Sequence, residues 1–206
     1  MSGKPNSGRP LRMIAGITGG LGCGKSTVAR ALERRGFRRL DSDAIVREHV
    51  LPSALVRDAL RERYGAEVVD AAGEVNRQAL AARVFADDAE RLWLEDVTHP
   101  GVFAHWRTAL AAEPGANWAV EVPLLFEKAL ENWFDFTVCV ACAPALQLAR
   151  LEQRGLPRVL AGQRISKQLP LARKIELSDF VLWNDGSAEF LESQVDRLVP
   201  ALLTSR

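Results

Sequence analysis

A run of residues near the amino terminus has the composition and spacing of a phosphate-binding site. Residues 19–26 are Gly-Gly-Leu-Gly-Cys-Gly-Lys-Ser, which fits the pattern G-x-x-x-x-G-K-[ST] in full. The glycines allow backbone conformations in which successive amide N–H groups face one anion, and a helix that begins here adds positive dipole charge. In this pattern Lys25 reaches the β- and γ-phosphates of a nucleoside triphosphate, and the Ser26 hydroxyl helps to hold Mg²⁺.

Two carboxylates in the sequence Asp41-Ser42-Asp43 could supply acid–base chemistry. A carboxylate at the carboxyl end of a parallel strand, close to a triphosphate, can orient a water molecule or accept a proton from an attacking hydroxyl. The alternative is that Asp41 or Ser42 caps a helix with no chemical role. We favour a functional role for Asp43 and leave both roles open for Asp41.

A third feature is a basic segment. Residues 150–174 contain seven basic residues and one acidic residue, a local net charge of +6 in a chain whose formal net charge is +1. Gly155, Pro157 and Pro170 interrupt its helical pattern, so the segment could form a hinged flap that neutralises phosphate charge and excludes water. The alternative is an ordinary solvated face.

Alternating strands and helices would position these residues. Short apolar segments predict five strands, at residues 12–18, 37–40, 118–122, 135–141 and 179–183. Helical patterns lie between them, which favours a mostly parallel sheet with helices on both faces. The stretch between the second and third strands is far longer than a simple crossover needs and carries helical patterns, a hairpin at residues 67–75 and an expected helix break at His99-Pro100. We therefore expect a helical insertion there, where substrate specificity would reside.

The composition excludes several classes of protein. The chain has 206 residues, 48% of them hydrophobic and 26% charged, which is typical of one globular domain and not of a disordered protein. A net charge of +1 disfavours a bulk polyanion binder, and we expect neither a nucleic-acid nor a membrane partner. The longest apolar stretch is too short to span a bilayer, we see no secretory signal, and we expect residues 1–11 to form a disordered tail.

The three cysteines exclude a disulfide scaffold and suit a cytoplasmic location. Cys139 and Cys142 have the spacing of a redox motif, but they lie in or at the end of a predicted strand, so we expect both to be core residues. Cys23 could be sensitive to oxidation within the phosphate loop, although a small side chain that fits the loop is the favoured interpretation. No cluster of His and Cys indicates zinc.

In their order along the chain these motifs resemble those of the dephospho-coenzyme A kinase family of P-loop kinases. The similarity begins with residues 17–29 and the Asp41-Ser42-Asp43 sequence, and its most diagnostic later string is Pro-Leu-Leu-Phe-Glu at residues 123–127. Further similar positions are Val75-Asn76-Arg77, Val84-Phe85, His99-Pro100, Gln147, Arg150, Arg164-Ile165, Gln168 and Asn184-Asp185-Gly186. The resemblance extends over residues 13–198, with two departures: Cys23 replaces a common Ser, and Ser42 replaces a common Ala.

The resemblance implies the last step of coenzyme A biosynthesis, in which ATP phosphorylates the ribose 3′-hydroxyl of dephospho-coenzyme A and leaves ADP. It implies a three-layer α/β/α P-loop kinase with a parallel five-stranded sheet. The core would comprise residues 12–50 and 117–206, the coenzyme A-binding insertion residues 51–116, and a helical lid about residues 150–174. ATP with Mg²⁺ and dephospho-coenzyme A would be the ligands of a monomer or weak homo-oligomer.

The resemblance also implies roles for single residues. The catalytic candidates are Lys25, Asp43 and Arg150. The ATP-binding candidates are Gly20, Leu21, Gly22, Cys23, Gly24, Lys25, Ser26, Thr27, Arg164, Asn184, Asp185 and Gly186, with Ser26 also at the metal. The substrate-binding candidates are Asp43, Arg77, His99, Pro123, Leu124 and Glu127.

Two rival functions stay open on the residues alone. The first is another small-molecule or nucleotide kinase on the same core, against which the Pro-Leu-Leu-Phe-Glu string and the helical insertion argue. The second is a nucleotide-gated switch that hydrolyses ATP or GTP slowly, although the sequence has no N-K-x-D string for guanine recognition.

Overall fold

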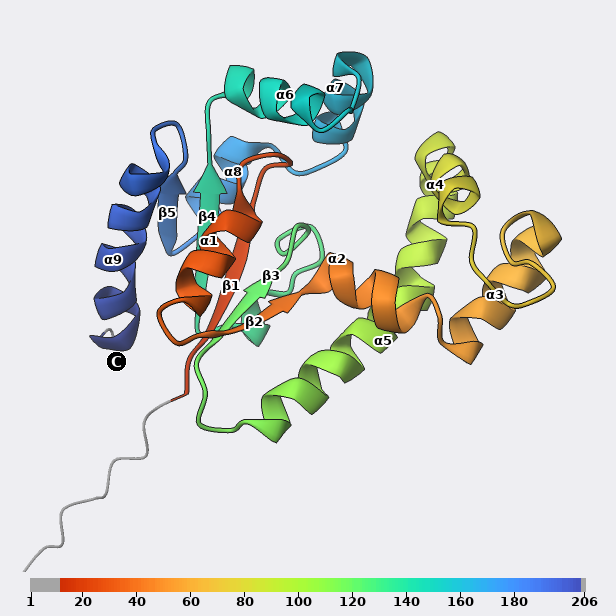
Figure 1. The fold of residues 1–206 in the computed structure, drawn as a ribbon, viewed down its shortest axis with the longest axis horizontal. Coiled ribbons are helices and arrows are strands. Elements are labelled where there is room, and N and C mark those ends of the chain that lie inside the picture. Colours follow the sequence, from red (N-terminus) through yellow and green to blue (C-terminus); the bar gives the residue numbers. More distant parts are fainter. Residues whose placement is uncertain (1–11, 205–206) are drawn as a thin grey trace, which may run out of the picture. The chain divides into compact units, whose positions relative to one another are not determined.

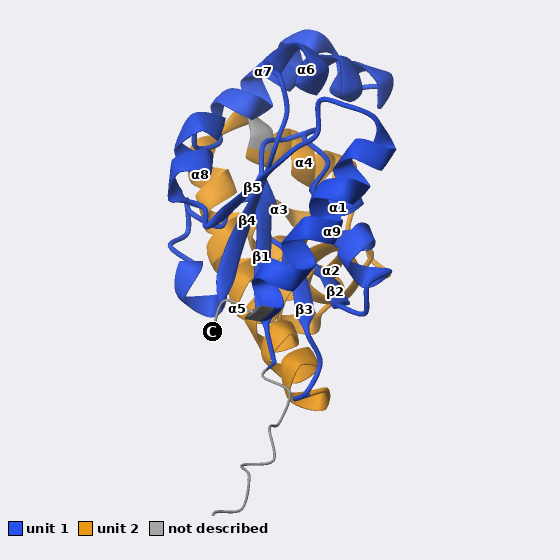
Figure 2. Ribbon diagram, turned by 90° about the vertical axis from the view of Figure 1, so that its left-hand side faces the viewer, with its two compact units in different colours: residues 1–41, 114–206 blue, residues 42–113 orange. Residues whose placement is uncertain are grey.

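The computed structural model describes residues 12–204, so the expected tail at residues 1–11 lies outside the described residues. The chain divides into two compact units (Figure 2). One unit contains the chain up to Asp41 together with the chain from Pro114 onward, and the other is Ser42–Glu113. No helix within residues 12–204 combines the length and the apolar character that a bilayer span requires.

The first unit is built on one sheet of five parallel strands in the order β2-β3-β1-β4-β5 (Figure 1). The strands are β1 (Ile14–Gly19), β2 (Arg38–Asp41), β3 (Trp118–Glu121), β4 (Phe136–Ala141) and β5 (Phe180–Trp183). All five predicted strands are present, and their ends lie within two residues of the predicted ones. β1 is central and almost completely buried, as expected for a parallel strand covered on both faces.

Helices cover both faces of this sheet. The helices in contact with its strands are α1 (Lys25–Glu33), α8 (Leu171–Leu177) and α9 (Ala188–Thr204). The unit also contains α6 (Pro144–Gln153) and α7 (Arg158–Ser166), which pack against each other, and a short 3₁₀ turn at Glu131–Trp133. Side chains alternate along β1: Ala15 and Ile17 join the core under α1 and α9, whereas a side chain at Gly16 would meet Phe134 and Leu125 on the opposite face. The predicted three-layer α/β/α arrangement is therefore confirmed.

The second unit is helical. It contains α2 (Ser42–Ile45), which continues into a π-helical segment (Val46–Val50), then α3 (Ala54–Tyr64), a 3₁₀ turn (Gly65–Glu67), α4 (Arg77–Ala86) and α5 (Asp88–Ala112). Asn76 and Asp87 accept hydrogen bonds from the amides of Ala79 and Ala89, which caps α4 and α5. The hairpin predicted at residues 67–75 is reduced to one antiparallel bridge between Val69 and Val75.

The predicted helix break at His99-Pro100 is wrong, because α5 runs without interruption from Asp88 to Ala112 with Pro100 inside it. Proline removes one helical hydrogen bond and usually ends or kinks a helix. Here Thr98, Val102 and Trp106 are buried on either side of Pro100, so packing stabilises the continuous helix. Tertiary packing thus outweighs the local preference.

Candidate active site

The phosphate-binding loop connects β1 to α1 and can be built only with glycine at its two ends. Gly19 has φ +135°, and a Cβ atom there would lie 2.1 Å from the carbonyl oxygen of Val140 in the neighbouring β4. Gly24 has φ +100°, and a Cβ atom there would lie 2.3 Å from Nδ2 of Asn184. Both positions demand a left-handed backbone and a close approach, which only glycine allows.

Lys25 begins α1, and its ammonium turns back over the loop. Lys25 Nζ donates hydrogen bonds to the carbonyl oxygens of Gly20 and Gly19 at 3.0 and 3.2 Å. The next residues, Ser26 and Thr27, lie in the first turn of α1, where the helix dipole favours an anion. The ammonium and the helix terminus therefore place positive charge at the same loop.

Asn184 and Asp185 lie beside the loop although they come much later in the sequence. Asn184 Nδ2 donates to the carbonyl oxygen of Cys23 at 2.9 Å, and the Asn184 amide donates to Ala141 at the end of β4. Asp185 Oδ1 accepts from the amide of Ala143 at 2.6 Å. Asn184 thus joins the loop to the carboxyl end of β4, and Asp185 contacts the residue after Cys142 and not the loop. Gly186 is exposed, and its nearest neighbour is Phe190.

Arg150, on α6, joins the same cluster. Its Nη2 donates to the carbonyl oxygen of Asn184 at 2.8 Å. Its Nη1 is buried and has no hydrogen-bond partner among the described residues. A buried, unpaired guanidinium donor is costly unless a ligand completes its bonding. Arg164, the other predicted arginine, lies half-buried on α7.

The carboxyl ends of β2 and β3 carry a further acidic residue, Glu121, which the sequence analysis did not identify. Asp41 and Glu121 are register partners, and Arg39 bridges them, with Arg39 Nη2 at 2.7 Å from Glu121 Oε1 and 3.1 Å from Asp41 Oδ2. Burial raises the pKa of the Glu121 carboxyl, against the lowering effects of Arg39 and Lys25. Its position near the end of the strand predicted at residues 118–122, two residues before Pro123, is the feature that could have identified it.

Glu127 and Pro123 are held by a buried lysine of α8. Lys174 is fully shielded from solvent, and its Nζ donates to the carbonyl oxygen of Pro123 at 2.6 Å and pairs with Glu127 Oε1 at 2.8 Å. The Leu169 amide donates to the same Glu127 oxygen at 2.9 Å. Leu124, between these anchored residues, is half-buried.

The basic segment 150–174 was expected to form either a flap that faces phosphates or a solvated face, and neither description holds for Lys174, whose ammonium is buried inside the protein. Arg158 and Arg173 also have carboxylate partners, Glu152 and Glu176. The local excess of charge counted from the sequence is thus partly neutralised within the fold.

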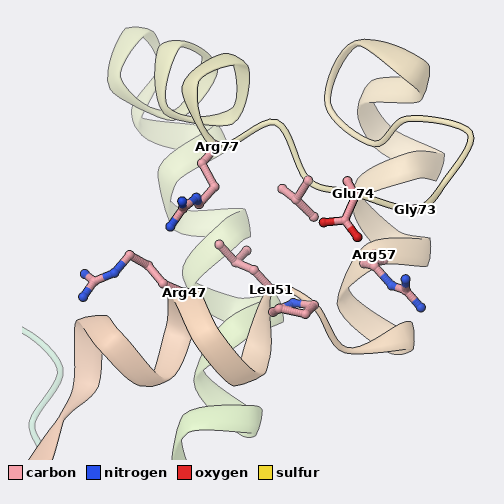
Figure 3. Close-up of a pocket in the computed structure, with 8 residues that line it drawn as sticks. Arg47, Leu51, Arg57, Gly73, Glu74 and Arg77 are labelled. Carbon is pink, nitrogen blue, oxygen red and sulfur yellow. The ribbon is translucent and has the colours of Figure 1, made fainter.

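The remaining predicted residues belong to the helical unit. Asp43 is exposed in the first turn of α2 and lines an apolar pocket of about 370 Å³. The other residues of this pocket are Val46, Arg47, Leu51, Arg77, Leu80, Ala81, Val84 and Leu94. Arg47, Leu51 and Arg77 also line a second pocket of about 310 Å³, together with Arg57 of α3. The guanidinium groups of Arg47 and Arg57 point in opposite directions there (Figure 3). His99 is half-buried with its ring centroid 5.8 Å from that of Phe103.

Comparison with known proteins identifies the family. Residues 13–189 match the sequence model of dephospho-CoA kinase. The chain belongs to the dephospho-CoA kinase family. It is 44% identical over 191 residues to the dephospho-CoA kinase of Thermosynechococcus vestitus, and the alignment covers 92% of this chain and 93% of that protein. It is 38% identical over 199 residues to that of Gloeobacter violaceus, which covers 96% of this chain and 97% of that protein.

Solved structures share the fold of this chain. The crystal structure of TT1252 from Thermus thermophilus aligns with TM-score 0.80 at 34% identity, covering 93% of this chain and 98% of that one. A dephospho-CoA kinase from Campylobacter jejuni aligns with TM-score 0.69 at 22% identity, covering 95% and 99%. A shikimate kinase from Bacteroides thetaiotaomicron, with TM-score 0.50, 17% identity and coverage of 92% and 98%, shares the fold alone.

Proposed function

We propose that this dephospho-CoA kinase family member transfers the γ-phosphoryl group of ATP to the ribose 3′-hydroxyl of dephospho-coenzyme A. The observation that carries this proposal is the convergence of the glycine loop, Lys25 and the unpaired Arg150 nitrogen at one edge of the sheet. Phosphoryl transfer is catalysed mainly by positioning and by positive charge on the transferred group, which is what these residues offer.

The loop amides of residues 20–26, with Lys25, bind the β- and γ-phosphates. Arg150 and Arg164 stabilise negative charge that develops on the transferred group. Asn184 holds the loop through the Cys23 carbonyl, and Asn184, Asp185 and Gly186 contribute to the adenine pocket. Thr27 completes the first turn of α1 beneath the phosphates.

Mg²⁺ is the metal that this loop would hold. The Ser26 hydroxyl in the first turn of α1 and the Glu121 carboxylate at the end of β3 are oxygen donors, which suit a hard cation. Among the described residues no group of three or more His, Cys, Asp or Glu side chains is arranged to hold a metal. That fits an ion bound mainly by substrate phosphates and by Ser26. When bound, Mg²⁺ neutralises phosphate charge.

The helical unit (Ser42–Glu113) binds dephospho-coenzyme A. Its apolar pocket suits the pantetheine arm, and Arg47 and Arg77 at that pocket supply charge for the phosphates of the substrate. Asp43, on the same pocket, accepts the proton of the 3′-hydroxyl. His99, Pro123, Leu124 and Glu127 complete the substrate side, and residues 150–174 form the lid.

The test is a comparison of acceptors for one purified enzyme. ADP release is measured with ATP and Mg²⁺ in the presence of dephospho-coenzyme A, shikimate or a nucleoside, or with no acceptor, and the phosphorylated product is located by NMR. The proposal expects release that depends on dephospho-coenzyme A and a phosphate on the 3′-oxygen. Rapid ADP release without any acceptor would instead favour a nucleotide-hydrolysing switch.

A further inference from the structure

Two cysteines that are distant in the sequence meet beneath the phosphate-binding loop. Cys142 Sγ lies 3.4 Å from Cys23 Sγ, although the two residues are 119 positions apart. Cys23 is inside the loop, and Cys142 directly follows β4. The carbonyl oxygen of Ala141, the last residue of β4, accepts a hydrogen bond from the backbone N–H of Asn184. Both side chains are buried in the same core cluster.

The third cysteine provides an internal contrast. Cys139 is also buried, but it lies outside that cluster, and the groups that act on its thiol include Lys174 and Ser178, on the α8 side of the sheet. Burial raises its pKa to about 11. Side chains alternate along a strand, so Cys139 and Cys142 face opposite layers and only Cys142 reaches the loop.

The two neighbouring thiols differ in character. The Cys142 thiol donates a hydrogen bond to the Cys23 sulfur, which together with Lys25 lowers the pKa of Cys23 against the effect of burial. The same bond and burial raise the pKa of Cys142. Since the thiolate is the reactive form, Cys23 is the sulfur that reacts first and Cys142 is the one placed to resolve it.

We propose that a peroxide converts Cys23 and Cys142 into a reversible disulfide that prevents the phosphate-binding loop from binding ATP. The loss of activity that follows rests on the proposed function; the disulfide and the loss of nucleotide binding do not. Nothing in the resemblance assigns this pair a role.

The chemistry requires one equivalent of hydrogen peroxide. The Cys23 thiolate attacks one peroxide oxygen, the O–O bond breaks, and hydroxide leaves as Cys23 becomes a sulfenic acid. The Cys142 sulfur then attacks the Cys23 sulfur, the S–O bond breaks, and water leaves with the Cys142 proton. The hydroxide takes up the proton that Cys23 had lost. Two thiols are oxidised by two electrons in total, and the peroxide is reduced to two molecules of water.

Formation of the disulfide requires the loop backbone to move. A disulfide has an S–S length of about 2.05 Å, so the sulfur atoms must approach by more than 1 Å from their present 3.4 Å separation. Cys142 is fixed at the sheet, because the amide of the next residue, Ala143, donates to Asp185. Cys23 Sγ lies 2.8 Å from where a Gly20 side chain would begin, directly against the loop backbone, so its displacement distorts the amides that would face the phosphates.

Burial makes the reaction depend on opening of the loop. Cys23 and Cys142 are 0% and 1% exposed, so peroxide reaches them only when the loop moves. Bound nucleotide holds the loop amides in place and should therefore protect the pair.

The experiment uses the full chain. The protein is treated with graded hydrogen peroxide, with and without ATP; free thiols are then alkylated, disulfide-linked peptides are identified by mass spectrometry, and ATP binding is measured by calorimetry. We expect a Cys23–Cys142 linked peptide, a rise in Kd for ATP of about tenfold or more, recovery with dithiothreitol, and slower oxidation when ATP is present.

Two variants make the result specific. Cys142→Ala should retain ATP binding after a peroxide dose that inactivates the parent protein, whereas Cys139→Ala should remain as sensitive as the parent. Peroxide inactivation without the linked peptide, or a linked protein that binds ATP as before, would overturn the proposal. If the linkage and the loss of ATP binding are found but dephospho-coenzyme A is not phosphorylated, only the proposed function fails.

Discussion

The ammonium nitrogen of Lys174 lies 2.8 Å from Oε1 of Glu127, and no part of the lysine side chain reaches solvent. The pair ties α8 to the segment that follows β3, because Lys174 also donates to the carbonyl oxygen of Pro123. A buried charge that loses its partner is strongly destabilising. The arrangement therefore makes this lysine a structural residue within a segment that its sequence marks as basic.

We expect Glu127→Gln to lower the free energy of unfolding by about 3–5 kcal/mol, because it leaves the Lys174 ammonium buried without a carboxylate. Urea-induced unfolding followed by circular dichroism measures the loss. The double variant Glu127→Leu with Lys174→Met should recover most of the stability. Arg173→Ala is the matched control: its ion pair with Glu176 is more than half exposed, so the change should stay below about 1 kcal/mol. Equal losses from Glu127→Gln and Arg173→Ala would contradict this account.

Arg150→Ala should lower kcat by about 100-fold, because removal of a charged group that acts on the transition state typically costs that much. ATP affinity, measured by calorimetry, should fall much less. Arg154→Ala, an exposed arginine at the end of α6, serves as the control and should keep its kcat. A variant of Arg150 with unchanged kcat and weaker ATP binding would assign the guanidinium to nucleotide binding alone.

Asp43→Asn should abolish turnover while ATP still binds, because the amide cannot accept the proton of the acceptor hydroxyl. The measurement pairs steady-state ADP release with calorimetric titration of ATP. Asp58→Asn, an exposed carboxylate on α3 that lines neither pocket, provides a comparison with the same change of charge. Near-normal turnover of the Asp43 variant would remove this residue from the mechanism.

Asn184→Ala should raise the Kd for ATP by about tenfold, since it removes the donor that holds the Cys23 carbonyl in the loop. Gln194→Ala is the control, because it also removes an amide side chain that bonds to the main chain near the end of β5. Gln194 also bonds main-chain groups at the end of β5, through the amide and carbonyl of Trp183, but it does not contact the loop. We expect ATP binding to be preserved in that variant; a parallel loss in both would indicate a general effect of loosening β5.

Glu90 gives the helical unit a defined dependence on pH. Arg63 donates two hydrogen bonds to this carboxylate and Tyr64 a third, which lowers the pKa of Glu90 to about 2. Because the folded-state pKa lies below the ordinary value of 4.5, the stabilisation is complete above pH 4.5 and is lost as the pH falls toward 2.

Glu90→Gln should therefore be less stable than the parent at pH 7, and the difference should shrink between pH 4.5 and 2, as followed by urea unfolding at each pH. Glu67→Gln is the control. Both side chains of the Glu67–Arg83 ion pair are more than half exposed, so this variant should have nearly the same free energy of unfolding as the parent at every pH. A Glu90 difference that does not change with pH would contradict the assignment.

The sequence predicts much of the sheet and the loop because both depend on local patterns. Apolar runs mark the strands, and the spacing of Gly19, Gly24, Lys25 and Ser26 reflects backbone requirements that the structure repeats. The family resemblance added the later residues Asn184 and Asp185, which no local pattern would have connected to the loop.

The features that the sequence did not predict depend on the direction in which side chains point and on packing between residues far apart in the sequence. The charge count over residues 150–174 could not reveal that Lys174 points inward, because direction is set by the partner Glu127. The expected break at Pro100 failed because packing around Val102 and Trp106 outweighed a local rule. The contact of Cys23 with Cys142 joins positions 119 residues apart, and only the sheet brings them together.

The clash that any side chain at position 19 would make is with the backbone of the sheet, 2.1 Å away at the carbonyl oxygen of Val140, and not with a ligand. A saturation library over residues 19–26 should therefore return glycine at position 19 even under a screen for soluble, folded protein alone. If the enzymatic activity became dispensable, selection for a folded protein would still keep glycine at position 19. Its conservation would then reflect the packing of β1 against β4 and would carry no information about catalysis.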